Sequence, residues 1–242
     1  YTPEGELDRS FGAWGSANPS VELGAQARAL NPMARLLDTD AEALGHYGGT
    51  RLQLQREGGA VVEDAFSGVG DLQLNAGAVV LAGVTIGSYT QNSGLLELQF
   101  NDAATPARLT QALQSIGYQY QGLGTPEIKI EWTFDDNDPA GANVSSVTQT
   151  VQIADTLAPV LRQGEKVNVD VPENTSGAFY TVEANDNVGV VAYRIWPDVD
   201  DDVFVIDANT GAIRFKTPPD YERSNDRYTL EVQVADAWDN VS

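Results

Sequence analysis

Cysteine is absent from this 242-residue chain, and histidine occurs only once. Without cysteine the chain can form neither a disulfide framework nor a thiolate metal site, and it has no thiolate nucleophile. His46 alone cannot supply the several imidazoles of a zinc centre. No nucleophile elbow, phosphate-binding loop or zinc-protease motif occurs. We therefore predict that the chain is not an enzyme, and a carboxylate pair for glycoside cleavage is the one catalytic alternative left open.

Basic side chains are scarce, with 14 lysines and arginines against 35 acidic residues and a formal net charge of −21. Nucleic acid and anionic membrane surfaces attract clustered positive charge, so neither is an expected partner. The acidity indicates solubility, cation binding or a saline habitat.

Long apolar runs are missing too, because the longest, residues 76–84, is interrupted by Gly77 and Gly83. We expect no signal peptide and no direct membrane insertion within this segment. The abrupt start at Tyr1 and stop at Ser242 are typical of a piece of a longer protein.

Most of the chain alternates apolar and polar residues with period two, as half-buried antiparallel strands do. The pattern covers residues 51–55, 95–100, 126–134, 148–153, 166–171, 179–183, 189–195, 203–206, 212–215 and 228–235. One short helix is predicted within 102–115, where Thr105 is a candidate cap and Pro106 suits the first turn. The sequence thus predicts an all-β chain of two tandem Greek-key β-sandwich domains, with one short helix in the first.

A linker is predicted at residues 155–159, because a strand ends at Ile153, Pro159 follows, and a new alternating segment begins at Lys166. The predicted domains are therefore 1–155 and 156–242. About seven short strands in the second domain give the density of a Greek-key sandwich.

Acidic residues gather where predicted strands end. In the second domain, Asp186 ends an early strand and Asp236 ends the last one. In the first domain, one predicted strand ends at Asp38 and Asp40, and a late one ends at Asp135 and Asp136. Two carboxylates about 4 Å apart repel by roughly 1 kcal/mol in water and about 4 kcal/mol at an effective dielectric of 20. A hard divalent cation removes this cost, and Ca²⁺ is the usual one. For the first-domain residues a capped turn or a solvated loop is the alternative.

Other conspicuous side chains have simpler interpretations. The acidic run at 198–202 lacks the glycine and glutamate that an EF-hand loop requires, so it is interpreted as solvated. Trp196 and Trp238 are interpreted as packing residues, with sugar stacking as the alternative for an exposed tryptophan.

Four ordered segments make the second domain resemble a cadherin repeat. They are Pro172-Glu173-Asn174 as the PEN-type start, 204–213 as the F-x-ID-x-x-TG-x-I run, Asp220-Tyr221-Glu222 as the DRE or DYE motif, and 228–236 as the Y-x-L-x-V-x-A-x-D strand. The sequence departs from the family at Asp186, where one aspartate replaces DxD, and at 155–159, which replace the DxNDNxP linker. These two segments also resemble bacterial Ig-like repeats with a DTxAP and DNVGV signature.

The first domain, over about 21–153, resembles a repeat of very large bacterial surface proteins of the RTX-adhesin kind. The matching segments are 37–40, 47–52, 57–60, 63–66, 115–120 and 130–137. This resemblance implies a cadherin-like sandwich with an elaborated region.

The cadherin resemblance implies which residues ligate Ca²⁺. Glu173, Asp220 and Glu222 are expected at the base with a following repeat, and Asp186 and Asp236 at the top. Asp155 is expected to complete a site at the junction between the domains.

The implied function is a calcium-binding structural and adhesive segment of a large bacterial cell-surface adhesin, located outside the cell. The expected partners are neighbouring domains of the parent chain and a cell-surface glycan or protein. A carbohydrate- or protein-binding module on a stalk and homophilic cadherin-like association remain the alternatives.

Overall fold

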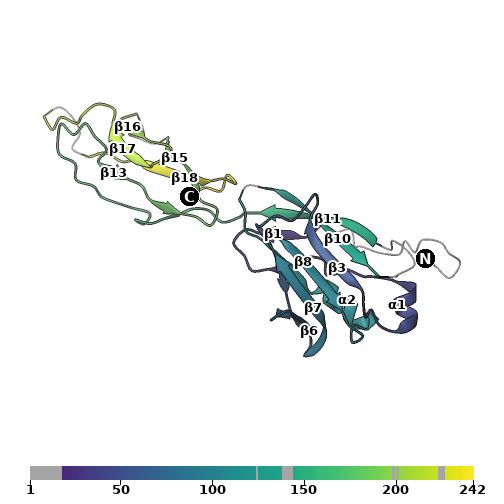
Figure 1. Ribbon diagram of the computed structural model, residues 1–242. Coiled ribbons are helices and arrows are strands. Elements are labelled where there is room, and N and C mark those ends of the chain that lie inside the picture. The colour runs from purple at the N-terminus through teal and green to yellow at the C-terminus, as the bar shows by residue number, and fades with distance from the viewer. Residues whose placement is uncertain (1–17, 124, 138–143, 198–199, 201, 223–226) are drawn as a thin grey trace. The chain divides into compact units, whose positions relative to one another are not determined.

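The structure, a computed structural model, describes residues 18–123, 125–137, 144–197, 200, 202–222 and 227–242, without the side chains of Thr39, Asp40 and Val191 (Figure 1). The chain divides into two compact units, Tyr1–Ala154 and Asp155–Ser242. Asp138, which belongs to the same acidic segment as Asp135 and Asp136, and part of the acidic run at 198–202, interpreted above as solvated, lie outside the described residues.

The first unit is built around an eight-stranded sheet in the order β1-β11-β10-β3-β8-β7-β6-β5. Its strands are β1 (Ser20–Glu22), β3 (Arg51–Arg56), β5 (Leu72–Asn75), β6 (Ala78–Leu81), β7 (Val84–Asn92), β8 (Leu95–Phe100), β10 (Glu127–Asp135) and β11 (Val144–Ala154). All neighbours are antiparallel except β1, which runs parallel to β11. A smaller antiparallel sheet has the order β2-β9-β4, with β2 (Arg28–Ala29), β9 (Ile116–Tyr120) and β4 (Asp64–Gly68).

Period-two alternation places the apolar side chains of the large sheet on its buried face. Trp132 of β10 lies opposite Leu54 of β3, and Phe134 lies opposite Leu52. All four side chains are buried. Burying each of them contributes about 1.5–3 kcal/mol relative to exposure, which fixes the register because a slip of one residue would expose the whole set.

A buried ion pair joins the two sheets of the first unit. The guanidinium of Arg56, at the end of β3, donates two hydrogen bonds to the carboxylate of Asp64 on β4. The Tyr118 hydroxyl of β9 donates to the same carboxylate at 2.7 Å. The Asp64 side chain is wholly buried, so these three donors replace the water it gives up on folding.

Two helices occur in the described part of the first unit. Helix α2 (Pro106–Gln114) falls inside the predicted segment, begins at the Thr105 cap and buries Leu109 and Leu113. Helix α1 (Thr39–Leu44) corrects the prediction of a single helix and of a strand ending at 37–40. Asp38 is its cap and accepts from the Ala41 N–H at 2.8 Å. The following Ala, Glu, Ala and Leu favour helix, and this outweighs the strand-like residues before them.

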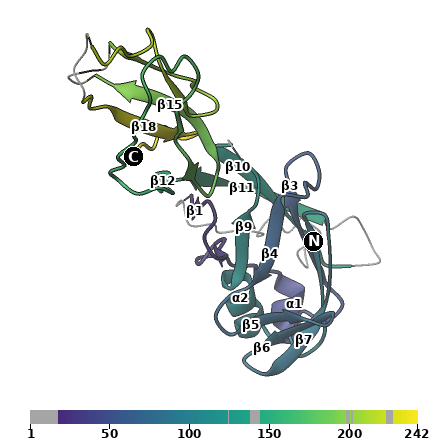
Figure 2. The ribbon, with the colours of Figure 1, turned by 90° about the vertical axis from the view of Figure 1, so that its left-hand side faces the viewer.

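The second unit is made of short strands: β12 (Val160–Leu161), β13 (Tyr180–Thr181), β14 (Ala184–Asn185), β15 (Val190–Trp196), β16 (Phe204–Ile206), β17 (Ala212–Phe215) and β18 (Glu231–Asp236). They form the sheets β12-β14, β13-β17-β16 and β15-β18, all antiparallel (Figures 1 and 2). The predicted all-β fold class is thereby confirmed.

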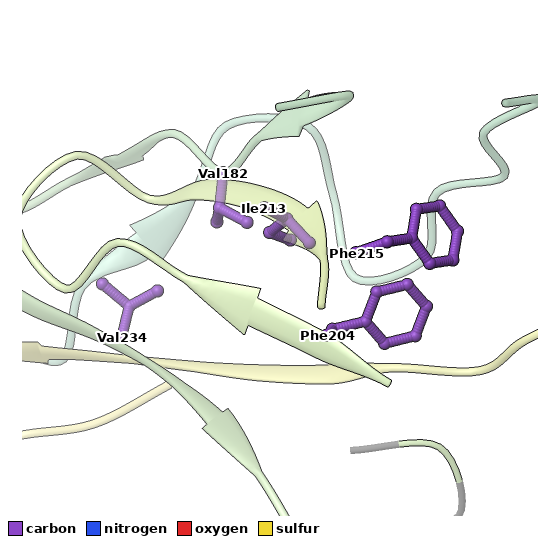
Figure 3. Close-up of a cluster of buried hydrophobic side chains, with 5 residues drawn as sticks. All are labelled: Val182, Phe204, Ile213, Phe215 and Val234. Carbon is purple, nitrogen blue, oxygen red and sulfur yellow. The ribbon is translucent and has the colours of Figure 1, made fainter. Parts of the chain in front are cut away.

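The core of the second unit is a cluster of five buried side chains, Val182, Phe204, Ile213, Phe215 and Val234 (Figure 3). The rings of Phe204 and Phe215 have centroids 4.9 Å apart. Thirteen further hydrophobic side chains pack around the cluster and are only partly buried. Among the described residues of the second unit, the fully buried part of the core is therefore small.

One predicted strand does not form. Residues 166–171 alternate as a strand does, but among the described residues this segment pairs with no other strand. Val167 and Val169 on it are 45% and 40% exposed. Local alternation favours an extended conformation, but a strand also needs a neighbour to bond its backbone.

No helix in the described part of the chain is long and apolar enough to cross a membrane.

Candidate metal centre

Three aspartates of the second unit come together where β14 and β18 end. Asp155 is the first residue of the unit, Asp186 directly follows β14, and Asp236 is the last residue of β18. One carboxylate oxygen from each lies within 4.8 Å of the other two. The three residues are 31 and 50 positions apart along the chain, so only the folded unit brings them together.

Asp236 is held by the turn that follows it. Its Oδ1 accepts the backbone N–H groups of Trp238 at 2.7 Å and Asn240 at 2.9 Å, and its Oδ2 accepts the Asn240 side-chain amide at 2.8 Å. Burial by itself raises the pKa of Asp236, but the Asn240 side chain and the two N–H groups outweigh it and hold this pKa below its ordinary value. Asp236 therefore stays ionised although it is only 1% exposed.

Asp155 is 6% exposed and has one carboxylate oxygen left without a protein partner. Its Oδ1 accepts from the Asn187 side-chain amide at 2.9 Å and from the Leu157 N–H at 3.4 Å. Its Oδ2 is buried and makes no hydrogen bond with the described residues. The Asn240 side-chain amide also donates to the Asp155 backbone oxygen at 3.1 Å, so Asn240 holds both Asp155 and Asp236.

Asp186 repeats this arrangement. Its Oδ1 accepts the Val188 N–H at 2.9 Å and closes the turn between β14 and β15. Gly189, with φ of 92°, completes the turn in a conformation that side-chain-bearing residues rarely adopt. The Asp186 Oδ2 is buried and unpartnered among the described residues. Two neighbouring carboxylates thus each present a buried free oxygen.

This arrangement is costly for the protein by itself and suits a cation. At 4.8 Å and an effective dielectric of 20, each pair of charges repels by roughly 3 kcal/mol. Two oxygens on one Ca²⁺ ion, each 2.3–2.6 Å from it, are at most about 5 Å apart. The spacing of the three carboxylates meets that limit. The donor set is all oxygen and carries three negative charges, which fits Ca²⁺ and not a metal that prefers sulfur or imidazole.

The predicted base ligands lie elsewhere in the second unit, where Glu173 and Glu222 are exposed and Asp220 is half-buried. Glu173 Oε2 accepts the Tyr221 N–H at 3.3 Å, and the Asn174 N–H donates to the Pro219 carbonyl at 2.8 Å. Asp220 accepts the Glu222 N–H at 3.1 Å. The fold therefore brings the PEN-type segment beside the 220–222 segment. Within the described residues they form no compact carboxylate cluster, and metal ligation by Glu173, Asp220 and Glu222 stays a prediction.

The predicted first-unit ligands are not gathered into a cluster by the described residues. Asp38 caps helix α1, and Asp135 accepts the Asn137 N–H at 2.9 Å, which closes a turn after β10. Asp136 has a partner within the structure, and the side chain of Asp40 is outside the described part. Metal ligation by these four residues remains untested.

Asn187 and Asn240 hold the carboxylates in place, and sequence reasoning missed both. The available signal was their position, one residue after Asp186 and four residues after Asp236. Asparagine at a turn is common for local reasons, so this spacing alone does not distinguish a turn residue from one that holds a site.

No protein-family model matches the chain, and no curated protein matches its sequence. Similar solved structures include Drosophila N-cadherin EC1-3, with a TM-score of 0.36 and 12% identity over 93% of this chain and 60% of that one. The human Desmocollin-1 ectodomain has a TM-score of 0.33 and 15% identity, over 93% of this chain and 36% of that one. Protocadherin gammaB7 EC3-6 has a TM-score of 0.31 and 19% identity, over 72% of this chain and 37% of that one. The chain thus spans less than two thirds of each. Because these scores and identities are low, the function proposed below depends on the motifs and on the carboxylate geometry.

Proposed function

We propose that this chain is a calcium-binding structural segment of an extracellular adhesive protein. The observation that carries the proposal is the cluster of Asp155, Asp186 and Asp236, with two buried carboxylate oxygens that have no protein donor. The ordered cadherin-like motifs of the second unit support the same function, because they end at Asp236. A large bacterial surface adhesin is the proposed parent, on the resemblance of the first unit to RTX-adhesin repeats.

The ion has a structural role in this proposal. Asp155 directly follows Ala154, the last residue of β11, so an ion that holds Asp155 restrains the chain where the second unit begins. Restraint at this point limits bending between neighbouring domains. Extracellular calcium sites bind in the range of about 10⁻⁴ to 10⁻³ M, so millimolar calcium outside a cell fills a large part of such sites.

Calorimetric titration of the chelator-treated chain with CaCl₂ tests the proposal. We expect one site that is lost in Asp155→Asn, Asp186→Asn and Asp236→Asn. Asp207→Asn is the matched control, because Asp207 also accepts two N–H groups in a turn, from Asn209 and Thr210, but lies outside the carboxylate cluster. Undiminished calcium binding by all three cluster variants would reject the proposed site.

A carbohydrate-binding role is the second candidate, and one side chain favours it. Trp196, interpreted from sequence as a packing residue, is in fact 48% exposed at the end of β15. The guanidinium of Arg194 lies 6.0 Å from its ring centre, so the two side chains form a small aromatic and cationic surface. Retention of the chain on a glycan array, lost in Trp196→Ala, would support this role.

A further inference from the structure

We propose that Asn174 is an acceptor site for an asparagine-linked sugar, transferred from a diphosphate-activated donor. The inference goes beyond the proposed calcium-binding role. It takes from that role only the extracellular setting, in which asparagines of exposed Asn-x-Ser/Thr motifs carry sugars.

The sequence contains this acceptor motif, with a residue other than proline in the middle, at three places. They are Asn143-Val144-Ser145, Asn174-Thr175-Ser176 and Asn240-Val241-Ser242. Asn143 lies outside the described residues, so the structure distinguishes between the other two. A motif this short also occurs by chance, and the local structure therefore decides which asparagine can react.

Asn174 lies in a turn whose backbone is held and whose side chain is free. Its φ is 61°, a left-handed conformation that asparagine tolerates better than most residues. Its backbone N–H donates to the Pro219 carbonyl at 2.8 Å, which fixes the turn against the neighbouring segment. The residue is exposed, and its side-chain amide makes no hydrogen bond with the described residues. The amide is therefore available to an enzyme in the folded chain.

The hydroxyl that the motif requires is accessible as well. Ser176 is exposed, and its side chain makes no hydrogen bond with the described residues. Thr175, the middle residue, donates its hydroxyl to the Pro172 carbonyl at 2.7 Å and so supports the turn without being one of the two required residues. A transferase can thus contact the side chains of Asn174 and Ser176 without breaking a described hydrogen bond.

Asn240 has the same motif, but its amide is already in use. An asparagine amide nitrogen carries two hydrogens. In Asn240 this nitrogen donates to the Asp155 backbone oxygen at 3.1 Å and to the Asp236 Oδ2 at 2.8 Å. Sugar transfer would remove one of these hydrogens and place a bulky group beside two buried aspartates. The folded chain therefore offers Asn174 to a transferase and withholds Asn240.

The transfer is a substitution at the anomeric carbon of the sugar. The Asn174 Nδ2 forms a bond to C1, and the bond between C1 and the diphosphate oxygen breaks. The electron pair of that bond leaves with the diphosphate, and Nδ2 gives up one proton to solvent. The product is a neutral secondary amide, and no oxidant or reductant takes part.

The test uses the folded full chain in calcium, UDP-glucose and a soluble asparagine glucosyltransferase that recognises the Asn-x-Ser/Thr motif. Peptide mass spectrometry maps the modified sites, and synthetic peptides of residues 170–179 and 236–242 give the rate of each motif without the fold. We expect Asn174 of the folded chain to react at about its peptide rate. Asn240 should react at least about tenfold more slowly than its peptide, because two hydrogen bonds must first break.

Two variants separate the motif from the turn. Ser176→Ala removes the motif and should abolish transfer to Asn174, whereas Thr175→Ala keeps the motif and should retain transfer; circular dichroism checks that both fold. Absence of hexose on Asn174 of the folded chain, equal relative rates at Asn174 and Asn240, or the same result for the two variants each overturns the proposal. Calcium calorimetry tests the proposed function independently, so the two can fail separately.

Discussion

Replacing Asp186 by asparagine should change stability in opposite directions with and without calcium. Asparagine keeps the side-chain oxygen that closes the turn to the Val188 N–H but removes one of three clustered charges. In chelator, the substitution relieves two repulsive pairs of roughly 3 kcal/mol each, taken at a separation of 4.8 Å and an effective dielectric of 20. Since Asp186 is only half-buried, we expect a gain of about 1–3 kcal/mol.

In calcium, Asp186→Asn should lower the stability of the folded state instead of raising it. An ion at 100 times its dissociation constant stabilises the folded state by about 2.7 kcal/mol, and this contribution is lost when a ligand is removed. For a unit of this size each kcal/mol moves the melting temperature by about 4–8 °C. Circular dichroism melts of wild type and Asp186→Asn, each in EGTA and in 10 mM CaCl₂, measure the four values. The same sign of change in both conditions would refute the reasoning, and Asp207→Asn should show no reversal.

Three further predictions follow from named contacts. Asn240→Ala removes the donor that holds both Asp155 and Asp236, so calorimetry should show calcium affinity reduced by about tenfold, whereas Asn209→Ala should leave it unchanged. The pKa of Asp236 is lowered in the folded state, so as pH falls the unfolded chain binds a proton at Asp236 before the folded chain does. The contribution of Asp236 to stability is therefore present above about pH 4 and is lost as pH drops through the folded pKa. Chemical denaturation in EGTA between pH 3 and 6 measures this loss, and Asp236→Asn should flatten the pH dependence. Asp64→Ala leaves the Arg56 charge without its buried partner and should cost about 3–5 kcal/mol in urea unfolding of the first unit, while an unchanged unfolding midpoint would contradict the assigned role.

Sequence alone predicts most strands of this chain but not all of their pairings. Residues 95–100 and 212–215 form strands with the predicted bounds, because alternation and a flanking glycine coincide there. Residues 166–171 alternate equally well, but no strand among the described residues pairs with them. The helix after Asp38 was missed because an acidic residue after apolar ones fits a strand end and a helix cap alike.

The candidate site was predictable in part. Strand ends placed Asp186 and Asp236 at one apex, and the linker position drew attention to Asp155. The roles of Asn187 and Asn240 depend on contacts with Asp155, 32 and 85 residues away, which no local pattern encodes. Whether a carboxylate faces its neighbours or solvent is likewise decided by tertiary packing, as the exposed Glu173 and the buried Asp155 illustrate.

A crystal structure grown in calcium, with anomalous scattering to identify the ion, tests the central claim most directly. The account predicts one Ca²⁺ ion within 2.3–2.6 Å of carboxylate oxygens from Asp155, Asp186 and Asp236. A well-ordered second unit with only water, or nothing, among these three side chains at saturating calcium would contradict it.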